Sequence, residues 1–309
     1  MSSAAQQPLP PPPGMEGNTR AYVLLTLTAL CWGANAVFGR IVVGEASPMV
    51  VVSLRWLGVL LMLAVFARND VRRDWQVLRT HLWFIAAIGA MGFTAFNSLF
   101  YVAAHFTTAV NIGILQGSIP VFVLLGAFFA YRTRVTALQL AGVTLTMFGV
   151  LLVGSGGDLA RLAALQLNPG DLLMIIACLL YAGYAVALRR RPAVSALGLF
   201  TIMAAAAFVS SLPLLAVEAA LGYLQWPTPT GWLIIGLVSL FPSFLAQIFF
   251  IQSVALIGPG RAGIFVNLVP VFASILAVVF LSEPFEFFHA LALVLVLGGI
   301  WLAERAKPR

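Results

Sequence analysis

The chain has 309 residues, of which 61% are hydrophobic and 9% charged, and its formal net charge is +7. Soluble domains carry roughly 25% charged residues, so this composition excludes an ordinary soluble enzyme or binding domain. The basic residues lie in small clusters between apolar runs, and no soluble stretch combines them with aromatic residues. This pattern excludes a nucleic-acid-binding surface, and we expect lipid to be the main solvent.

The N-terminal segment 1–20 contains two glutamines and the proline cluster Pro8–Pro13. It lacks the basic region, short apolar core and cleavage site of a signal peptide. We therefore predict a disordered cytoplasmic tail at 1–20, followed by a first span that acts as an uncleaved signal.

The remaining sequence divides into apolar runs that are long enough to cross a membrane. About 20 largely apolar residues suffice for a transmembrane helix. Charges, Pro and Gly bound ten such runs, at 21–43, 48–67, 82–103, 108–131, 136–154, 171–188, 195–217, 232–254, 261–281 and 285–303. The sequence thus predicts an all-α polytopic membrane protein with ten transmembrane helices, in which 68–81 is the first long loop.

The distribution of Lys and Arg predicts how the spans are oriented. Cytoplasmic loops carry an excess of these residues. With the N-terminus inside, fourteen of them fall in cytoplasmic segments and only Arg40 and Arg161 fall outside. We expect an integral protein of the bacterial cytoplasmic (inner) membrane with both termini in the cytoplasm.

The two halves of the chain are related by an internal repeat with a spacing of 150 residues. Gly113, Pro120-Val121-Phe122 and Gly149 recur without a gap as Gly263, Pro270-Val271-Phe272 and Gly299. An odd number of spans in each half inverts the second copy relative to the first. We expect a first five-helix unit at 21–154 and a second, inverted unit at 171–304.

Several motifs resemble those of a known group of transporters. They are Ala29-Leu30-Cys31-Trp32-Gly33-Ala34-Asn35 in span one, the two Pro-Val-Phe centres, Gly149 and Gly299, and Ser282-Glu283-Pro284 at the end of span nine. Together with the inverted five-helix halves, they resemble the EamA-type branch of the drug/metabolite transporter superfamily over about residues 20–305. The nearest likeness is to bacterial exporters of aromatic amino acids and related metabolites.

The resemblance implies a ten-helix basket. Its central cavity would be lined by spans one to four and six to nine, and spans five and ten would support it from outside. Small multidrug transporters, which resemble this superfamily, depend on an acidic residue in the first span. The matching stretch 28–38 has none, and every Asp and Glu falls in a loop, a tail or a span end. A simple carboxylate-based cation antiporter is therefore disfavoured.

The polar and aromatic residues inside the spans are the candidates for substrate binding. They are Trp32, Asn35, Asn97, Tyr101, Gln116, Tyr181, Tyr184, Gln247 and Asn267. Amides in a solvated cavity would hold the polar end of a substrate, and aromatic rings its apolar end. The alternative role for each amide is to hold helices together by hydrogen bonds.

Arg55 is the one cation well inside a span. It either pairs with a substrate carboxylate or a cavity amide, or extends to the membrane interface, roughly 10 Å away at 1.5 Å per residue.

Candidate hinges also occur at repeated positions. Pro120 and Pro270 lie mid-span, where proline removes a backbone hydrogen bond and kinks a helix. Gly113, Gly117 and Gly263 allow close approach of neighbouring helices. These residues form either a symmetric pair of hinges or fixed kinks that shape the cavity.

The sequence favours a secondary exporter of small amphipathic metabolites, including aromatic amino acids, that works by alternating access. The alternative within this class is efflux of drugs or toxic compounds, while a nucleotide-sugar carrier would need more cavity cations. An enzyme is disfavoured, because His81, His105 and His289 lie apart near span ends and no HExxH, GxSxG or phosphate-binding loop occurs. Cys31 and Cys178 lie in spans, so we expect no metal site. We also expect no cofactor and no nucleic-acid partner. A lipid bilayer, a small-molecule substrate and a monomeric or homodimeric state are expected.

Overall fold

The computed structural model of the protein describes residues 15–132, 135–158, 160 and 167–305. All regular secondary structure in this part of the chain is helical. Within the described residues, nine helical segments are long and apolar enough to cross a membrane, and a shorter apolar helix covers Phe287–Ala303. The predicted all-α polytopic membrane fold is confirmed, and the helices match the ten expected spans to within a few residues at most ends.

The helices of the first half follow the predicted order of spans. They are α1 (Met15–Ile41), α2 (Pro48–Phe66), α3 (Arg68–Thr80), α4 (Leu82–Gly89), the π-helical η1 (Ala90–Ala95), α5 (Phe96–Ala103), α6 (Ala109–Gln116), α7 (Ile119–Tyr131) and α8 (Ala137–Gly154). Span three is the continuous run α4–η1–α5, and span four is divided into α6 and α7.

The second half repeats this arrangement. Its elements are α10 (Pro169–Ala187), the short 3₁₀ turn η2 (Leu188–Arg190), α11 (Ala196–Ala220), α12 (Pro229–Val238), the π-helical η3 (Ser239–Leu245), α13 (Ala246–Ile257), α14 (Pro259–Val266), α15 (Val269–Leu281) and α16 (Phe287–Arg305). Span eight contains η3 where span three contains η1, and span nine is divided where span four is divided.

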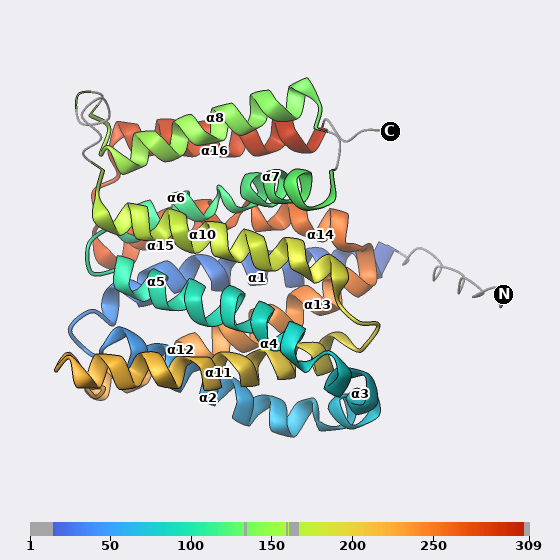
Figure 1. The fold of residues 1–309 in the computed structure, drawn as a ribbon. Helices are drawn as coiled ribbons and strands as arrows, with labels where there is room; N and C mark the ends of the chain where they lie inside the picture. The colour runs from blue at the N-terminus through green and yellow to red at the C-terminus, as the bar shows by residue number, and fades with distance from the viewer. Residues whose placement is uncertain (1–14, 133–134, 159, 161–166, 306–309) are drawn as a thin grey trace.

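The helices run side by side, and the start of α1 and the end of α16 lie at the same end of the bundle (Figure 1). We call this end the terminal side and the opposite end the distal side. α1 runs from the terminal to the distal side, whereas α10, the first helix of the second half, runs back from the distal to the terminal side. The two halves are therefore inverted with respect to each other.

Backbone geometry also repeats between the halves. Arg132 and Ser282 are the two described non-glycine residues with positive φ, at 54° and 52°, and each caps the C-terminus of a helix. They are 150 residues apart. A backbone conformation that L-residues rarely adopt is thus found at the same place in both copies.

α8 and α16 pack along each other at one edge of the bundle (Figure 1). Glycines permit this close approach: a Cβ on Gly149 would lie 2.9 Å from the carbonyl oxygen of Ala292, and one on Gly299 would lie 2.3 Å from Thr146 Oγ1. The repeated glycines of spans five and ten therefore serve contact between these two helices.

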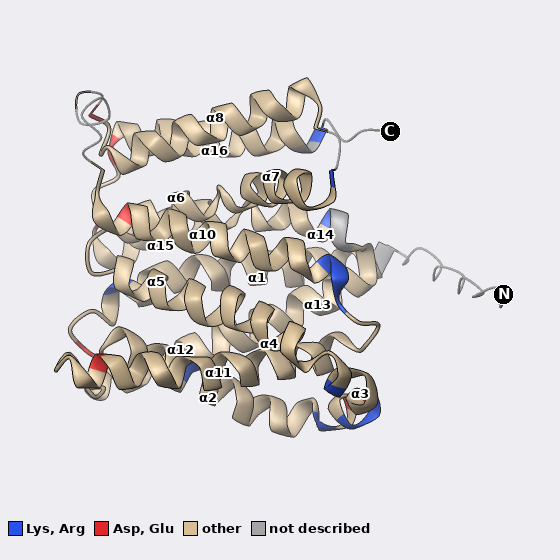
Figure 2. Ribbon diagram, viewed as in Figure 1, with Lys and Arg blue, Asp and Glu red and all other residues tan. Residues whose placement is uncertain are grey.

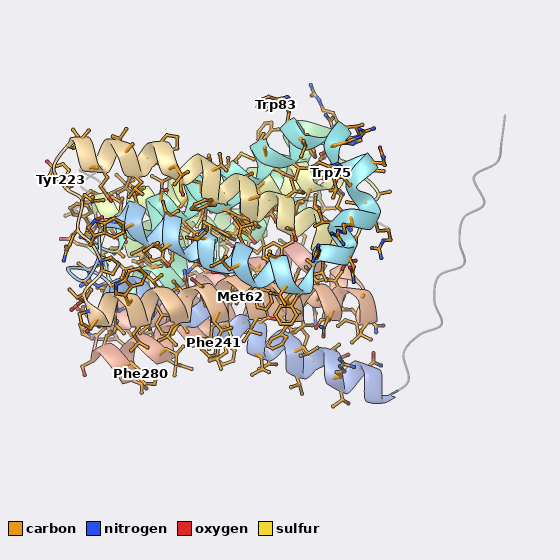
Figure 3. All side chains as sticks on the ribbon, turned by 90° about the horizontal axis from the view of Figure 1, so that it is seen from below. Met62, Trp75, Trp83, Tyr223, Phe241 and Phe280 are labelled. Carbon is orange, nitrogen blue, oxygen red and sulfur yellow. The ribbon has the colours of Figure 1, made fainter. Side chains whose placement is uncertain are left out.

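Charge differs between the two ends. Arginine gathers on the terminal side, and most acidic residues lie on the distal side (Figure 2). Asp70 and Asp74 of α3 and Arg40 near the end of α1 are exceptions. Between these ends the outer surface is apolar: Phe241 and Phe280 are exposed, with Trp75 and Trp83 towards the terminal side and Tyr223 towards the distal side (Figure 3). Aromatic residues at both ends of an apolar band are typical of membrane interfaces.

Two boundary predictions were wrong. The part of the predicted tail before residue 15 lies outside the described residues, but 15–20 belong to α1. A helix satisfies its own backbone hydrogen bonds, so it can continue beyond the apolar core. The segment 68–81, predicted to be a loop, contains α3, which is amphipathic: Leu78 is buried, whereas the arginines Arg72 and Arg73 face outwards.

The prolines of the predicted hinges do not lie inside continuous helices. The chain turns at 117–118 between α6 and α7 and at 267–268 between α14 and α15. Pro120 and Pro270 are the second residues of α7 and α15. Proline in the first turn of a helix sacrifices no intrahelical hydrogen bond, so each span is divided before its proline rather than kinked at it.

Candidate functional site

An inner cavity of about 110 Å³ lies between the two halves. Its aromatic wall residues are Trp32, Trp56, Phe93, Phe96, Tyr181 and Phe200. Its polar wall residues are Asn35, Arg55, Asn97, Gln116, Ser243 and Gln247. Both kinds of side chain come from both repeats, and they line the same small space.

A larger vestibule of about 890 Å³ adjoins the inner cavity. The two spaces share the wall residues Trp32, Ile119, Tyr181, Gln247 and Val266. The vestibule continues along α7, α13 and α14 to Arg189 and Arg191 beside the end of α10 and to Ala303 near the end of α16, which are all on the terminal side. The inner cavity is thus approached from the terminal side.

Arg55 is the centre of the polar wall and is only 5% exposed. Its Nη1 donates to Asn97 Oδ1 at 2.8 Å, Tyr101 Oη at 2.9 Å and Asn35 Oδ1 at 3.1 Å, and its Nε donates to Ser243 Oγ at 2.5 Å. These contacts join α1, α2, α5 and η3. The side chain therefore points into the bundle and does not extend to the interface.

The two π-helical segments lie beside the partners of Arg55. Asn97 Nδ2 donates to the carbonyl of Phe93 in η1 at 2.6 Å, which orients its Oδ1 as an acceptor. Ser243 Oγ donates to the carbonyl of Val238, five residues earlier, at 2.5 Å. Trp32 Nε1 donates to the carbonyl of Pro242 at 3.0 Å. π-Helical turns alter the backbone hydrogen bonding of a helix and often occur at functional sites.

Six of the nine residues predicted to bind substrate line the inner cavity together: Trp32, Asn35, Asn97, Gln116, Tyr181 and Gln247. Tyr184 lines the vestibule instead. Tyr101 is fully buried against Arg55, and Asn267, which caps α14, is in neither wall. Their binding roles stay predictions.

The predicted hinge residues occupy different surroundings. Pro120 and Gly263 line the vestibule. Gly113 lies against Ala273 of α15, and Gly117 lies against Val296 of α16 and Pro270. These five residues therefore surround the junctions between the helices of the divided spans, where a change of shape is predicted to occur.

Sequence reasoning missed Trp56, Phe93 and Ser243 as wall residues, and it left the direction of Arg55 open. Arg55 and Ser243 are 188 residues apart, and no repeat or motif links them. Trp56 stacks on Phe93, with ring centroids 4.5 Å apart and an interplanar angle of 9°. Neither ring differs in sequence context from the many apolar residues around it, so only the tertiary structure brings them to the cavity.

The distal side contains a second polar cluster, which closes that end. Asp171 at the start of α10 accepts from Thr107 Oγ1 at 2.5 Å and from Asn111 Nδ2 at 3.2 Å. Asn111 Oδ1 lies 3.1 Å from His289 Nε2. Nearby, Glu283 accepts from the backbone N–H groups of Ala109 and Val110, both at 3.0 Å, and thereby caps α6. His289 and Asp171, distant in sequence, are thus linked through Asn111.

Comparison with known proteins identifies the family. The model of the EamA-like transporter family matches residues 19–155 and again 168–304. The chain belongs to the EamA-like transporter family. The expected resemblance to the EamA-type branch is confirmed, and the family model matches twice, once in each half of the chain.

Relatives of this EamA-like chain are named as transporters. It is 27% identical over 293 residues to the uncharacterized transporter YetK of Bacillus subtilis, covering 94% of this chain and 88% of the relative. It is 27% identical over 289 residues to an uncharacterized transporter of Archaeoglobus fulgidus, covering 92% and 97%. It is 24% identical over 285 residues to the uncharacterized inner membrane transporter YedA of Escherichia coli K12, covering 90% and 88%.

A solved protein structure matches the fold with a TM-score of 0.62 at 18% identity, covering 93% of this chain and 97% of the other. The family and the names of the relatives indicate a membrane transporter and not an enzyme.

Proposed function

We propose that this transporter exports small amphipathic metabolites, amino acids with aromatic side chains among them, across the bacterial cytoplasmic membrane by alternating access. The observation that carries the proposal is the inner cavity between the inverted halves, approached from the terminal side and closed on the distal side. Its wall combines aromatic rings with amides, which suits a molecule with an apolar and a polar end.

The inverted repeat supplies the physical basis for alternating access. On the distal side, α6 of the first half packs along α15 of the second. The symmetry-equivalent helices α14 and α7 both form walls of the vestibule. If α14 and α7 packed together as α6 and α15 do, and α6 and α15 separated, the terminal side would close and the distal side would open around the same cavity.

The arrangement of charge supports the proposed orientation. Arginines on the terminal side and carboxylates on the distal side agree with cytoplasmic termini, so the vestibule would receive its substrate from the cytoplasm. We take the five-helix units to be 21–154 and 171–304, as the repeat predicts.

Flux of labelled phenylalanine in proteoliposomes without an ion gradient tests this proposal. We expect saturable flux that unlabelled phenylalanine inhibits. The variant Gln247→Leu removes an amide from both cavity walls and should reduce this flux several-fold. Thr144→Val on the exposed face of α8 is the matched control and should leave it unchanged. Failure to move any amino acid, with efflux of drug-like cations instead, would contradict amino acid export and favour the drug-efflux alternative.

A further inference from the structure

We propose that Arg55 is a carboxylate-recognition site and that the substrates are monocarboxylates with an apolar or aromatic tail. The inference rests on the proposed transport function and deepens it by naming the chemical group that the cavity selects.

No acidic side chain among the described residues pairs with the charge of Arg55. Its four hydrogen-bond partners Asn35, Asn97, Tyr101 and Ser243 are all neutral. The ion pairs found among the described residues involve only Arg40 and Arg73 as cations. A buried charge is costly unless it is paired, and an ionisable side chain inside a membrane span commonly marks a substrate pathway. A negatively charged ligand would supply the missing partner.

Hydrogen-bond donors on this wall are also in excess. A guanidinium carries five N–H groups, and the two on Nη2 of Arg55 have no acceptor among the residues that the structure describes. Trp56 lies next in the chain, is 3% exposed, and its buried Nε1 likewise has no acceptor within the described part of the chain. Both residues line the inner cavity. A carboxylate offers two oxygens with about four acceptor positions, which complements such a surplus of donors.

The remainder of the cavity limits the ligand to one negative charge and an apolar tail. Arg55 is the one charged residue among the described wall residues of the inner cavity. Around it stand the rings of Trp32, Phe93, Phe96 and Phe200. The route to this site is positive too, because Arg189 and Arg191 are the charged residues of the described vestibule wall. Positive charge along an entry path attracts anions.

The same wall provides no carboxylate for a ligand ammonium group. Among the described residues, neither the inner cavity nor the vestibule is lined by Asp or Glu. The ammonium of an amino acid would have to rely on neutral groups such as the amide oxygens of Gln116 and Gln247. The carboxylate is therefore the charged group that binding requires, and the ammonium is dispensable.

Three ligands of similar shape test the inference on the purified full-length protein: 3-phenylpropionate, 3-phenylpropanamide and phenylethylammonium. Equilibrium binding should favour the carboxylate over the neutral amide by roughly ten- to hundredfold, the range for a hydrogen bond to a charged group. The cation should bind most weakly. Comparable affinity of the carboxylate and the amide, or no binding of the carboxylate, would overturn the proposal.

Two variants test which residues cause the preference for the carboxylate. Arg55→Gln should lower the affinity for 3-phenylpropionate by a similar factor and lower that for the neutral amide much less, which removes the preference for the carboxylate. Trp56→Phe keeps a ring but removes the unpaired N–H. Because it leaves the hydrogen bonds of Arg55 intact, it still tests the site if Arg55→Gln fails to fold. It should reduce carboxylate affinity by about three- to tenfold. If Trp56→Phe leaves this affinity unaltered and the wild type does not discriminate, the carboxylate site is refuted.

The flux assay separates this inference from the proposed function. Transport of the amide as fast as the carboxylate would refute the role of Arg55 and leave amphipathic transport in place. Absence of flux for every compound in the series, with carboxylate-selective binding retained, would refute transport of this substrate class and leave the recognition site in place.

Discussion

The α6–α15 contact on the distal side and the α14–α7 region on the terminal side are built from equivalent parts of the repeat, yet they differ in packing. A Cβ on Gly113 would lie 2.3 Å from the Cβ of Ala273. On Gly263, 150 residues later, a Cβ would meet no atom of the described chain within 4 Å. Gly263 and Val123, the equivalent of Ala273, both line the vestibule. The same sequence unit thus adopts a closed arrangement at one end and an open arrangement at the other.

Carboxylates hold the distal side together, and one of them, Glu283, has no acidic counterpart in the repeat. Asp171 and Glu283 of the second half bind Thr107, Asn111 and the N-terminus of α6 in the first. Glu218 of α11 likewise accepts from Ser47 Oγ at 2.6 Å and Met49 N–H at 3.1 Å at the start of α2. The residue 150 positions before Glu283 is Thr133 rather than an acid. The carboxylate cap of α6 therefore has no acidic counterpart in the repeat, and it adds to the packing that favours the closed distal side.

Substitution of the matched glycines Gly113 and Gly263 should have the largest effect on stability. Gly113→Ala overfills the α6–α15 contact and should destabilise the closed distal side by about 1–3 kcal/mol. Gly263→Ala enters open space and should leave the stability of this conformation unchanged or raise it by up to about 1 kcal/mol through helix propensity. Thermal unfolding of the two variants in detergent measures the difference. Equal losses in both would show that the two ends are packed alike.

Removal of a distal carboxylate should have a smaller effect. Glu283→Gln weakens the cap on the two N–H groups of α6 and should cost about 1 kcal/mol, as helix caps usually do. The distal side would then open more often, which labelling of a distal cysteine by an impermeant maleimide detects. The exposed neighbour Glu286 provides the control, since Glu286→Gln should leave labelling unaltered. Faster labelling in both variants would point to net charge rather than to the cap.

The smallest effect is expected from the loss of a contact of α3, which lies on the terminal side outside the spans. Asp74 accepts from the N–H of Ser195 at 2.7 Å at the start of α11. Hydrogen bonds from Ser195, followed by those from Arg73, lower the pKa of Asp74 from 3.8 to about 2. Because the pKa is lower in the folded state, this contact stabilises the docked α3 above pH 3.8 and is lost as the pH falls through about 2.

Hydrogen exchange across α3 measures this docking. Asp74→Asn should increase exchange at neutral pH. Among the described residues, Asp70 binds only Arg73 of the same helix, at 2.8 Å, so Asp70→Asn should leave exchange unchanged. An equal response to the two substitutions would assign the effect to surface charge.

The spans could be predicted from the sequence because the membrane imposes a strong constraint: every backbone polar group must be satisfied within a long apolar helix. The repeat predicted the inversion. Asn97 and Gln247, which are 150 residues apart, both line the inner cavity. α3 was missed because its charges suggested a loop, although Val71, Trp75 and Leu78 recur at helical spacing.

Other features depend on tertiary packing. The π-helical segments η1 and η3 and the breaks before Pro120 and Pro270 leave no mark in hydropathy. The direction of Arg55 depends on Ser243 and Asn35, which lie on other helices. These are the elements that shape the cavity, so the fold was more predictable than the site.

Accessibility of two matched cysteines tests the alternation of the two ends most directly. Leu124 lines the vestibule, and Ser274, 150 residues later, is buried on the other repeat. We would place Leu124→Cys and Ser274→Cys singly in a protein whose Cys31 and Cys178 are alanine, and add an impermeant maleimide from either side of the membrane. Leu124→Cys should react from the terminal side only, and Ser274→Cys should react from the distal side only, once substrate is being transported. Reaction of both cysteines from the same side would contradict the account.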